Sequence, residues 1–165
     1  MSAFKRILIG TDFTDCSRKA IARAVHGLAN EPGTVVRVVH VLQGEIPNPL
    51  YAHYQGPDPE QKEQARVDAL AMMQKLVPDS LGDGIEIEYV TPEGDPVVEM
   101  LNQAKEFQAD VVVLGTEGRT GLRGLLMSSV AEHVVRESVN GSMGRSLTYW
   151  NPSPVSRRHY SLDPV

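Results

Sequence analysis

A strand pattern, a glycine-rich loop and a helix start follow one another in the run Val111-Val112-Val113-Leu114-Gly115-Thr116-Glu117-Gly118-Arg119-Thr120-Gly121-Leu122-Arg123-Gly124. Apolar, mostly β-branched residues come first, and glycine then recurs at every third position. A helical pattern continues from residue 125 to about residue 137. Glycines allow a backbone to approach a ligand closely, and a helix start supplies unpaired N–H groups and a positive dipole end. The run therefore predicts a binding site for an anionic group such as phosphate.

The rest of the chain alternates between two kinds of pattern. Short apolar runs predict strands at residues 7–10, 35–42, 85–90 and 111–115. Helical patterns lie between and after them. Asp15 or Ser17 is expected to cap the first helix, Pro59 to open the second, Asp95 to cap the third before Pro96, and Gly124 or Leu125 to begin the fourth. Such an alternation predicts an α/β fold built from βαβ units around a mostly parallel sheet.

Individual segments carry further expectations. The run at residues 85–90 alternates apolar residues with glutamates, so one side of this strand is expected to meet water or to lie at an edge. Met72 and Met73 lie on the apolar stripe of the second helix and are expected in the core. Residues 44–59 are rich in proline and are interpreted as a long loop or lid after the second strand.

The composition favours one globular domain. The chain has 165 residues, a formal net charge of −5 and one cysteine, Cys16. The negative charge argues against a general binder of nucleic acid or of anionic membranes. The lone cysteine excludes an internal disulfide, and neither His40 nor His53 has a second ligand at the spacing of a metal site. No apolar run approaches the ~20 residues of a membrane span, and no secretory signal is recognised, so a soluble cytoplasmic protein is expected.

The chain changes character after residue 137. Glycine, serine, proline and arginine dominate the following segment, in which only Leu147 to Trp150 could add a short strand. We therefore predict an α/β domain over residues 1–137 and an atypical, partly disordered tail over residues 138–165.

Four motifs occur together within residues 4–137. The first strand ends in Ile9-Gly10-Thr11-Asp12-Phe13-Thr14, and the second strand contains Val39-His40-Val41. The triplet Gly94-Asp95-Pro96 precedes the third helix, and the glycine-rich loop Gly115-Thr116-Glu117-Gly118-Arg119-Thr120-Gly121 follows the fourth strand. The loop motif is quite specific when the other three accompany it. Together they resemble the universal stress protein family.

This resemblance implies a doubly wound fold, Rossmann-like or adenine nucleotide alpha hydrolase-like. It implies a five-stranded parallel sheet with helices on both faces, in three α/β/α layers. It also implies a homodimer paired through the last strand. The family usually forms that strand soon after the fourth helix, where this chain has Ser138-Val139-Asn140-Gly141 instead.

The resemblance further implies ATP, with or without Mg²⁺, as a ligand. ATP-binding members carry a loop of glycine, two residues, glycine, nine residues, glycine, and serine or threonine. Gly115, Gly118 and Ser129 agree with that pattern, whereas Ser128 stands where the third glycine is expected. The Ser128 side chain would either crowd the phosphates or donate a hydrogen bond to them.

The proposed site lies where the strand order reverses, at the carboxyl ends of the first and fourth strands. Thr11 and Asp12 are the nucleotide-binding residues expected after the first strand, and Asp12 would accept hydrogen bonds from the ribose hydroxyls or the adenine edge. Val41 would meet adenine through its backbone. The groups expected around the phosphates are Gly115, Gly118, Arg119, Ser128 and Ser129.

Each of these residues also has a purely structural interpretation. Asp12 could cap a turn before the first helix, and the glycines could serve only tight turning and packing. The serines could bond back to helix carbonyls. His40 is expected to be packed in its strand, and Cys16 is more easily read as a structural residue than as a low-pKa thiol.

No catalytic constellation is visible in the sequence, because no base, nucleophile or paired carboxylates converge by spacing. The leading hypothesis is thus an adenine-nucleotide-binding module in stress response or signalling, in which slow ATP hydrolysis is not the main role. The alternative is an interaction protein of the same fold that binds no nucleotide, which Ser128 and the tail motivate. A third reading, an enzyme acting on a phosphorylated metabolite, lacks a visible base.

Overall fold

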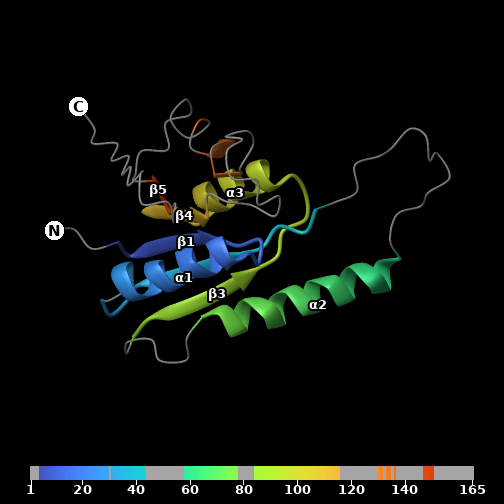
Figure 1. The fold of residues 1–165 in the computed structure, drawn as a ribbon, viewed down its shortest axis with the longest axis horizontal. Coiled ribbons are helices and arrows are strands. Elements are labelled where there is room, and N and C mark those ends of the chain that lie inside the picture. Colours follow the sequence, from blue (N-terminus) through green and yellow to red (C-terminus); the bar gives the residue numbers. More distant parts are fainter. Residues whose placement is uncertain are drawn as a thin grey trace.

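A parallel sheet of five strands forms the centre of the computed structural model (Figure 1). The structure describes residues 4–29, 31–43, 58–77, 84–115 and 147–150, together with residues 130, 131, 133, 134 and 136. The strands are β1 (Arg6–Gly10), β2 (Val35–Val39), β3 (Glu86–Val90), β4 (Val111–Gly115) and β5 (Leu147–Trp150). They lie in the order β3-β2-β1-β4-β5, and every neighbouring pair is parallel.

Helices cover both faces of this sheet. On one face, α1 (Asp15–Leu28) and α2 (Pro59–Leu76) enclose a core with alternate residues of β1, β2 and β4. On the other face, α3 (Pro96–Glu106) and the helical residues within 130–136 enclose a second core. The two layers of helix with the sheet between them confirm the doubly wound α/β fold that the sequence predicted.

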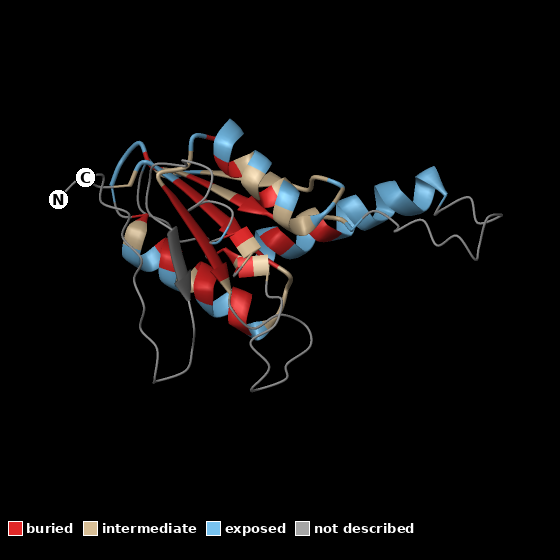
Figure 2. Ribbon diagram, turned by 90° about the horizontal axis from the view of Figure 1, so that it is seen from above, coloured by how far each residue is buried: buried red, intermediate tan, exposed pale blue. Residues whose placement is uncertain are grey.

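β1 lies in the middle of the molecule. Ile7 and Ile9 belong to the core beneath α1 and α2, Leu8 belongs to the core beneath α3, and all three are fully buried. Successive side chains of a strand point to opposite faces, so an unbroken apolar run suits a strand that is covered on both sides. Figure 2 shows the buried strands between helices whose outer faces are exposed.

The two outer strands are β3 and β5. The edge position of β3 confirms the expectation drawn from its alternating glutamates, since Glu86 is exposed and the rest of the strand is only half-buried. β5 forms at Leu147–Trp150, where the sequence allowed a short strand, and it pairs with β4. The fifth strand that the resemblance implied is therefore present. The boundary placed after residue 137 stays a prediction.

Two predicted boundaries were wrong. The first helix is capped by Thr14, whose Oγ1 accepts a hydrogen bond from the Ser17 backbone N–H at 3.3 Å, and not by Asp15 or Ser17. The second strand ends at Val39 and does not reach residue 42. Its neighbour β1 ends at Gly10, which pairs with Val39, and the register between the two strands goes no further. Beyond it, Leu42 forms an isolated bridge with Glu93.

α2 projects past the sheet, as the pale blue end of that helix in Figure 2 shows. Residues 59–68 are all exposed, and Lys62 near the helix start pairs with Glu93 at 2.9 Å. The third helix keeps its predicted start, because Asp95 Oδ1 accepts hydrogen bonds from the Val97 and Val98 N–H groups at 2.9 and 3.0 Å. None of the described helices has the length and apolar character needed to cross a membrane.

The expectation that both methionines of α2 lie in the core was half wrong. Met73 is fully buried, but Met72 is 41% exposed. Neighbouring helical residues point about 100° apart, so a helix that touches the sheet along one narrow stripe buries only one of them.

This pair gives a matched test of the packing. Met73→Ala removes a buried side chain and is expected to lower the free energy of unfolding by about 2–5 kcal/mol, through lost burial and a residual cavity. Met72→Ala is expected to change it by less than about 1 kcal/mol. Urea denaturation followed by circular dichroism measures both, and equal effects would contradict this placement of α2.

The end of β4 lies directly against the first turn of α1. A Cβ built on Gly115 would come within 2.9 Å of the Ser17 backbone nitrogen, closer than real Cβ contacts allow. Only glycine permits this approach without moving either the strand or the helix. By contrast, a Cβ on Gly27, near the other end of α1, would have no neighbour within 4 Å.

Alanine at these two glycines should therefore act in opposite directions. Gly115→Ala forces a backbone shift and is expected to destabilise the fold by about 1–3 kcal/mol. Gly27→Ala replaces an unhindered helical glycine and is expected to stabilise it by about 0.5–1 kcal/mol. Thermal unfolding of the two variants checks the signs, and a neutral Gly115→Ala would show that β4 and α1 are less tightly apposed.

Candidate functional site

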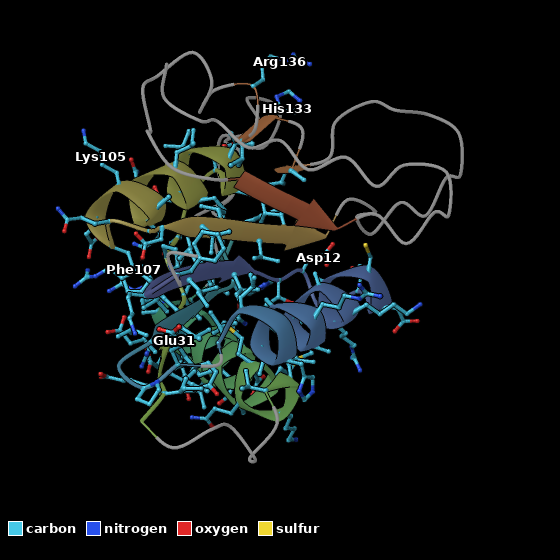
Figure 3. The ribbon with its side chains drawn as sticks, turned by 90° about the vertical axis from the view of Figure 1, so that its left-hand side faces the viewer. Asp12, Glu31, Lys105, Phe107, His133 and Arg136 are labelled. Atoms are coloured by element: carbon cyan, nitrogen blue, oxygen red, sulfur yellow. The ribbon has the colours of Figure 1, made fainter. Side chains whose placement is uncertain are left out.

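The strand order reverses beside β1. The chain first builds the sheet outward through β2 and β3, and then returns to place β4 on the opposite side of β1. In an open parallel sheet this reversal leaves room for a ligand at the carboxyl ends of the strands. Thr11 and Asp12 directly follow β1, and Gly115 ends β4. Figure 3 shows Asp12 beside the arrowheads of the strands.

Thr11 is buried, and its hydroxyl group forms hydrogen bonds within the protein. Its Oγ1 lies 3.0 Å from Ser17 Oγ and accepts a hydrogen bond from the Phe13 backbone N–H at 3.1 Å. These bonds join the end of β1 to the first turn of α1. The hydroxyl of Thr11 therefore fixes the position of the following turn.

Asp12 is half-buried, and its side chain adopts the turn-capping role, one of the two roles that the sequence left open. Its Oδ1 accepts hydrogen bonds from the Thr14 N–H at 3.1 Å and from Thr14 Oγ1 at 2.5 Å, which forms an Asx turn before α1. Its Oδ2 accepts no hydrogen bond from the residues that the structure describes. The turn-capping role is thus present, and it uses only one of the two carboxylate oxygens.

Val41 is half-buried and offers its backbone in a similar way. The N–H groups of His40 and Leu42 donate to the carbonyls of Val90 and Pro92, at 3.2 and 2.8 Å. Because backbone groups alternate in direction along an extended chain, the N–H of Val41 points away from that neighbour. Among the described residues, it and the Val41 carbonyl have no hydrogen-bond partner.

His40 is a residue whose role the sequence did not reveal. It was expected to be packed within a strand, but it lies just past the end of β2 and is half-buried. Its Nδ1 is 2.8 Å from the Thr11 carbonyl oxygen, and its ring centroid is 4.3 Å from that of Phe13. Phe13 has φ of 63°, in the left-handed region that bulky residues rarely adopt. A polar ring at the end of a buried strand was the only available signal.

The phosphate side of the predicted site involves the end of β4 and the loop that follows it. Gly115 is half-buried at the end of β4, whereas four predicted residues lie outside the described part of the chain: Gly118, Arg119, Ser128 and Ser129. His53 and most of the predicted lid at residues 44–59 lie outside it as well. Cys16 is buried in the first turn of α1, as expected of a structural cysteine.

The described residues contain no group of three or more His, Cys, Asp or Glu side chains that could hold a metal ion. The chemistry that these residues do offer is hydrogen bonding: a carboxylate oxygen from Asp12 and a backbone donor and acceptor from Val41. Such groups suit a ligand that carries hydroxyl groups and a planar polar edge.

Comparison with known proteins agrees with this architecture. The model of the Universal stress protein family matches residues 3–139. Universal stress protein MJ0531 of Methanocaldococcus jannaschii is 30% identical over 137 residues, which cover 82% of this chain and 78% of that protein. Universal stress protein YxiE of Bacillus subtilis is 27% identical over 137 residues, which cover 79% and 91%.

Solved structures share the fold. Universal stress protein UspA from Lactobacillus plantarum has a TM-score of 0.68 at 19% identity, and covers 92% of this chain and 100% of its own. A universal stress protein in complex with cAMP has a TM-score of 0.61 at 20% identity, with the same coverage. The protein from Archaeoglobus fulgidus in complex with dAMP scores 0.52 at 18% identity and covers 90% and 98%.

At these identities the solved structures establish the fold alone. The family model, in contrast, spans most of the sequence and includes both the end of β1 and the glycine-rich loop. The chain therefore belongs to the universal stress protein family.

Proposed function

We propose that this protein is an adenine-nucleotide-binding module of stress response or signalling. The observation that carries the proposal is the placement of Asp12. It follows the central strand at the reversal of the sheet, and its Oδ2 is not bonded to any described residue. The proposed ligand is ATP, with or without Mg²⁺, as the glycine-rich loop suggests.

The chemistry of Asp12 favours the nucleoside part of the ligand. A carboxylate accepts hydrogen bonds and repels phosphate, so its natural partners are the ribose hydroxyls or the amino group of adenine. Val41 lies at the end of the adjacent β2 and offers a backbone donor and acceptor, which complement a polar base edge. In this proposal the nucleoside lies near Asp12 and Val41.

The phosphates would then extend toward the loop after β4. We assign them to Gly115, Gly118, Arg119, Ser128 and Ser129, because glycines, a guanidinium and hydroxyl groups favour an anion. Two structural neighbours were solved with cAMP and dAMP, and these complexes support the adenine nucleotide as a ligand class.

The proposal describes a binding protein and not an enzyme, since nucleotide occupancy would alter its conformation or its choice of partner. The cytoplasm, where adenine nucleotides are made and used, is the compartment it implies. The competing function is a nucleotide-free interaction protein, and Ser128 in place of a loop glycine is the observation that favours it.

Isothermal titration of ATP with Mg²⁺ into the purified protein tests the proposal, with AMP and cAMP titrated in parallel. Asp12→Asn keeps Oδ1, and with it the turn to Thr14, but turns Oδ2 from an acceptor into a donor. We expect affinity to fall about tenfold to a hundredfold, as for a lost hydrogen bond to a charged group.

Asp68→Asn makes the same charge change on the exposed surface of α2 and serves as the control. It should leave the dissociation constant unchanged. Absence of binding to the wild-type protein at millimolar ATP would favour the nucleotide-free function. Equal effects of the two substitutions would remove Asp12 from the site.

A homodimer is the second part of the proposal. β5 lies at the edge of the sheet beside β4, and none of the described strands pairs with its other side, where a second copy of the chain could add a strand. Sedimentation equilibrium should yield a mass of about twice 18.1 kDa. A mass of 18.1 kDa at micromolar concentration would contradict dimerisation through this edge.

A further inference from the structure

The hydrogen-bond ladder between β1 and β2 stops one bond early. The Val35 N–H donates to the Lys5 carbonyl at 2.8 Å, and the Thr11 N–H donates to the Val39 carbonyl at 2.9 Å. In a parallel ladder, the N–H groups of one strand that bond to the same neighbour recur every second residue. The series that begins at Val35 therefore continues to Val41, whose acceptor would be the Thr11 carbonyl.

That carbonyl is bonded by a side chain instead. His40 Nδ1 lies 2.8 Å from the Thr11 oxygen. A carbonyl oxygen can only accept, so His40 must carry its proton on Nδ1. The N–H of Val41 is not bonded to any described residue. His40 thus takes the place that the next rung of the ladder would have occupied.

The same ring also contacts the residue on the other side of Asp12. Phe13 packs against His40 with a ring separation of 4.3 Å and an angle of 38° between the planes. Its left-handed backbone, with φ of 63°, is unfavourable for a bulky side chain unless surrounding contacts hold it. His40 therefore bonds to the residue before Asp12 and packs on the residue after it.

We propose that His40 is a positioning residue for the nucleotide site. By bonding to the Thr11 carbonyl it keeps the Val41 N–H available for the edge of the base, and by packing on Phe13 it holds the turn that presents Asp12. The role in binding rests on the proposed function. The role in the ladder does not, so the two can be tested apart.

Two substitutions separate the parts of the His40 side chain. His40→Phe keeps an aromatic ring against Phe13 but has no donor for the Thr11 carbonyl. His40→Asn places an amide N–H where Nδ1 was, but lacks the ring. Val41 amide hydrogen exchange, measured by NMR without nucleotide, reports on the ladder, and titration with ATP and Mg²⁺ reports on binding.

In His40→Phe the freed carbonyl should capture the Val41 N–H. We expect the Val41 amide to exchange more slowly than in the wild type, while nucleotide affinity falls about five- to tenfold, as for one lost hydrogen bond. His40→Asn should retain the fast exchange of Val41. General destabilisation would speed exchange at many amides and cannot slow it at this one.

The imidazole tautomer of the wild-type protein provides a check that does not depend on any variant. A long-range ¹H–¹⁵N correlation spectrum should show that the Nδ1 nitrogen of His40 carries a proton. A ring protonated on Nε2 alone, or unchanged Val41 exchange in a folded His40→Phe, would overturn the proposal. Slower Val41 exchange without nucleotide binding to the wild type would support the ladder role and reject the binding function.

Discussion

The pairing of β1 along both of its edges is the constraint on which the rest of the structure depends. With β2 on one side and β4 on the other, β1 has no free backbone edge, and both of its faces are buried by helices. The enclosed part of such a strand must be apolar, as Ile7, Leu8 and Ile9 are. The first polar side chain after the strand that is not buried is Asp12, which follows the buried Thr11 at the carboxyl end of β1. The same topology therefore explains both the burial of β1 and the position of the Asp12 carboxylate.

Much of the architecture could be predicted from local sequence, and the errors have a common physical origin. β1 and β4 were predicted well because strands covered on both faces are recognisable as unbroken apolar runs. The start of α3 was predicted because Asp95 and Pro96 act within one turn of the helix. The end of β2 and the unequal burial of Met72 and Met73 were not, since each depends on how far a neighbouring element extends. Such limits are set by tertiary contacts that no window of sequence contains.

The same distinction between local sequence and tertiary contacts applies to the candidate site. Asp12 and Val41 were identified through the resemblance and their position at strand ends, but the use of Oδ1 for a turn, with Oδ2 left over, required the structure. The role of His40 depends on the register between β1 and β2, which brings its ring to the Thr11 carbonyl. A one-residue change of register would abolish that contact and would leave the sequence pattern unaltered. The spacing of residues in the sequence therefore does not predict this contact.

The projecting half of α2 bears on how such a chain diverges. Residues 59–68 are all exposed, so replacement of one polar side chain by another there alters stability little. Substitutions can therefore accumulate in this segment while the buried strands and the turn at Asp12 stay under strict packing constraints. An identity of 30% to a relative is compatible with a preserved core, provided that the differences concentrate at exposed positions. In this protein a polar substitution on the exposed start of α2 disturbs little, whereas a substitution in β1 disturbs the cores on both faces of the sheet.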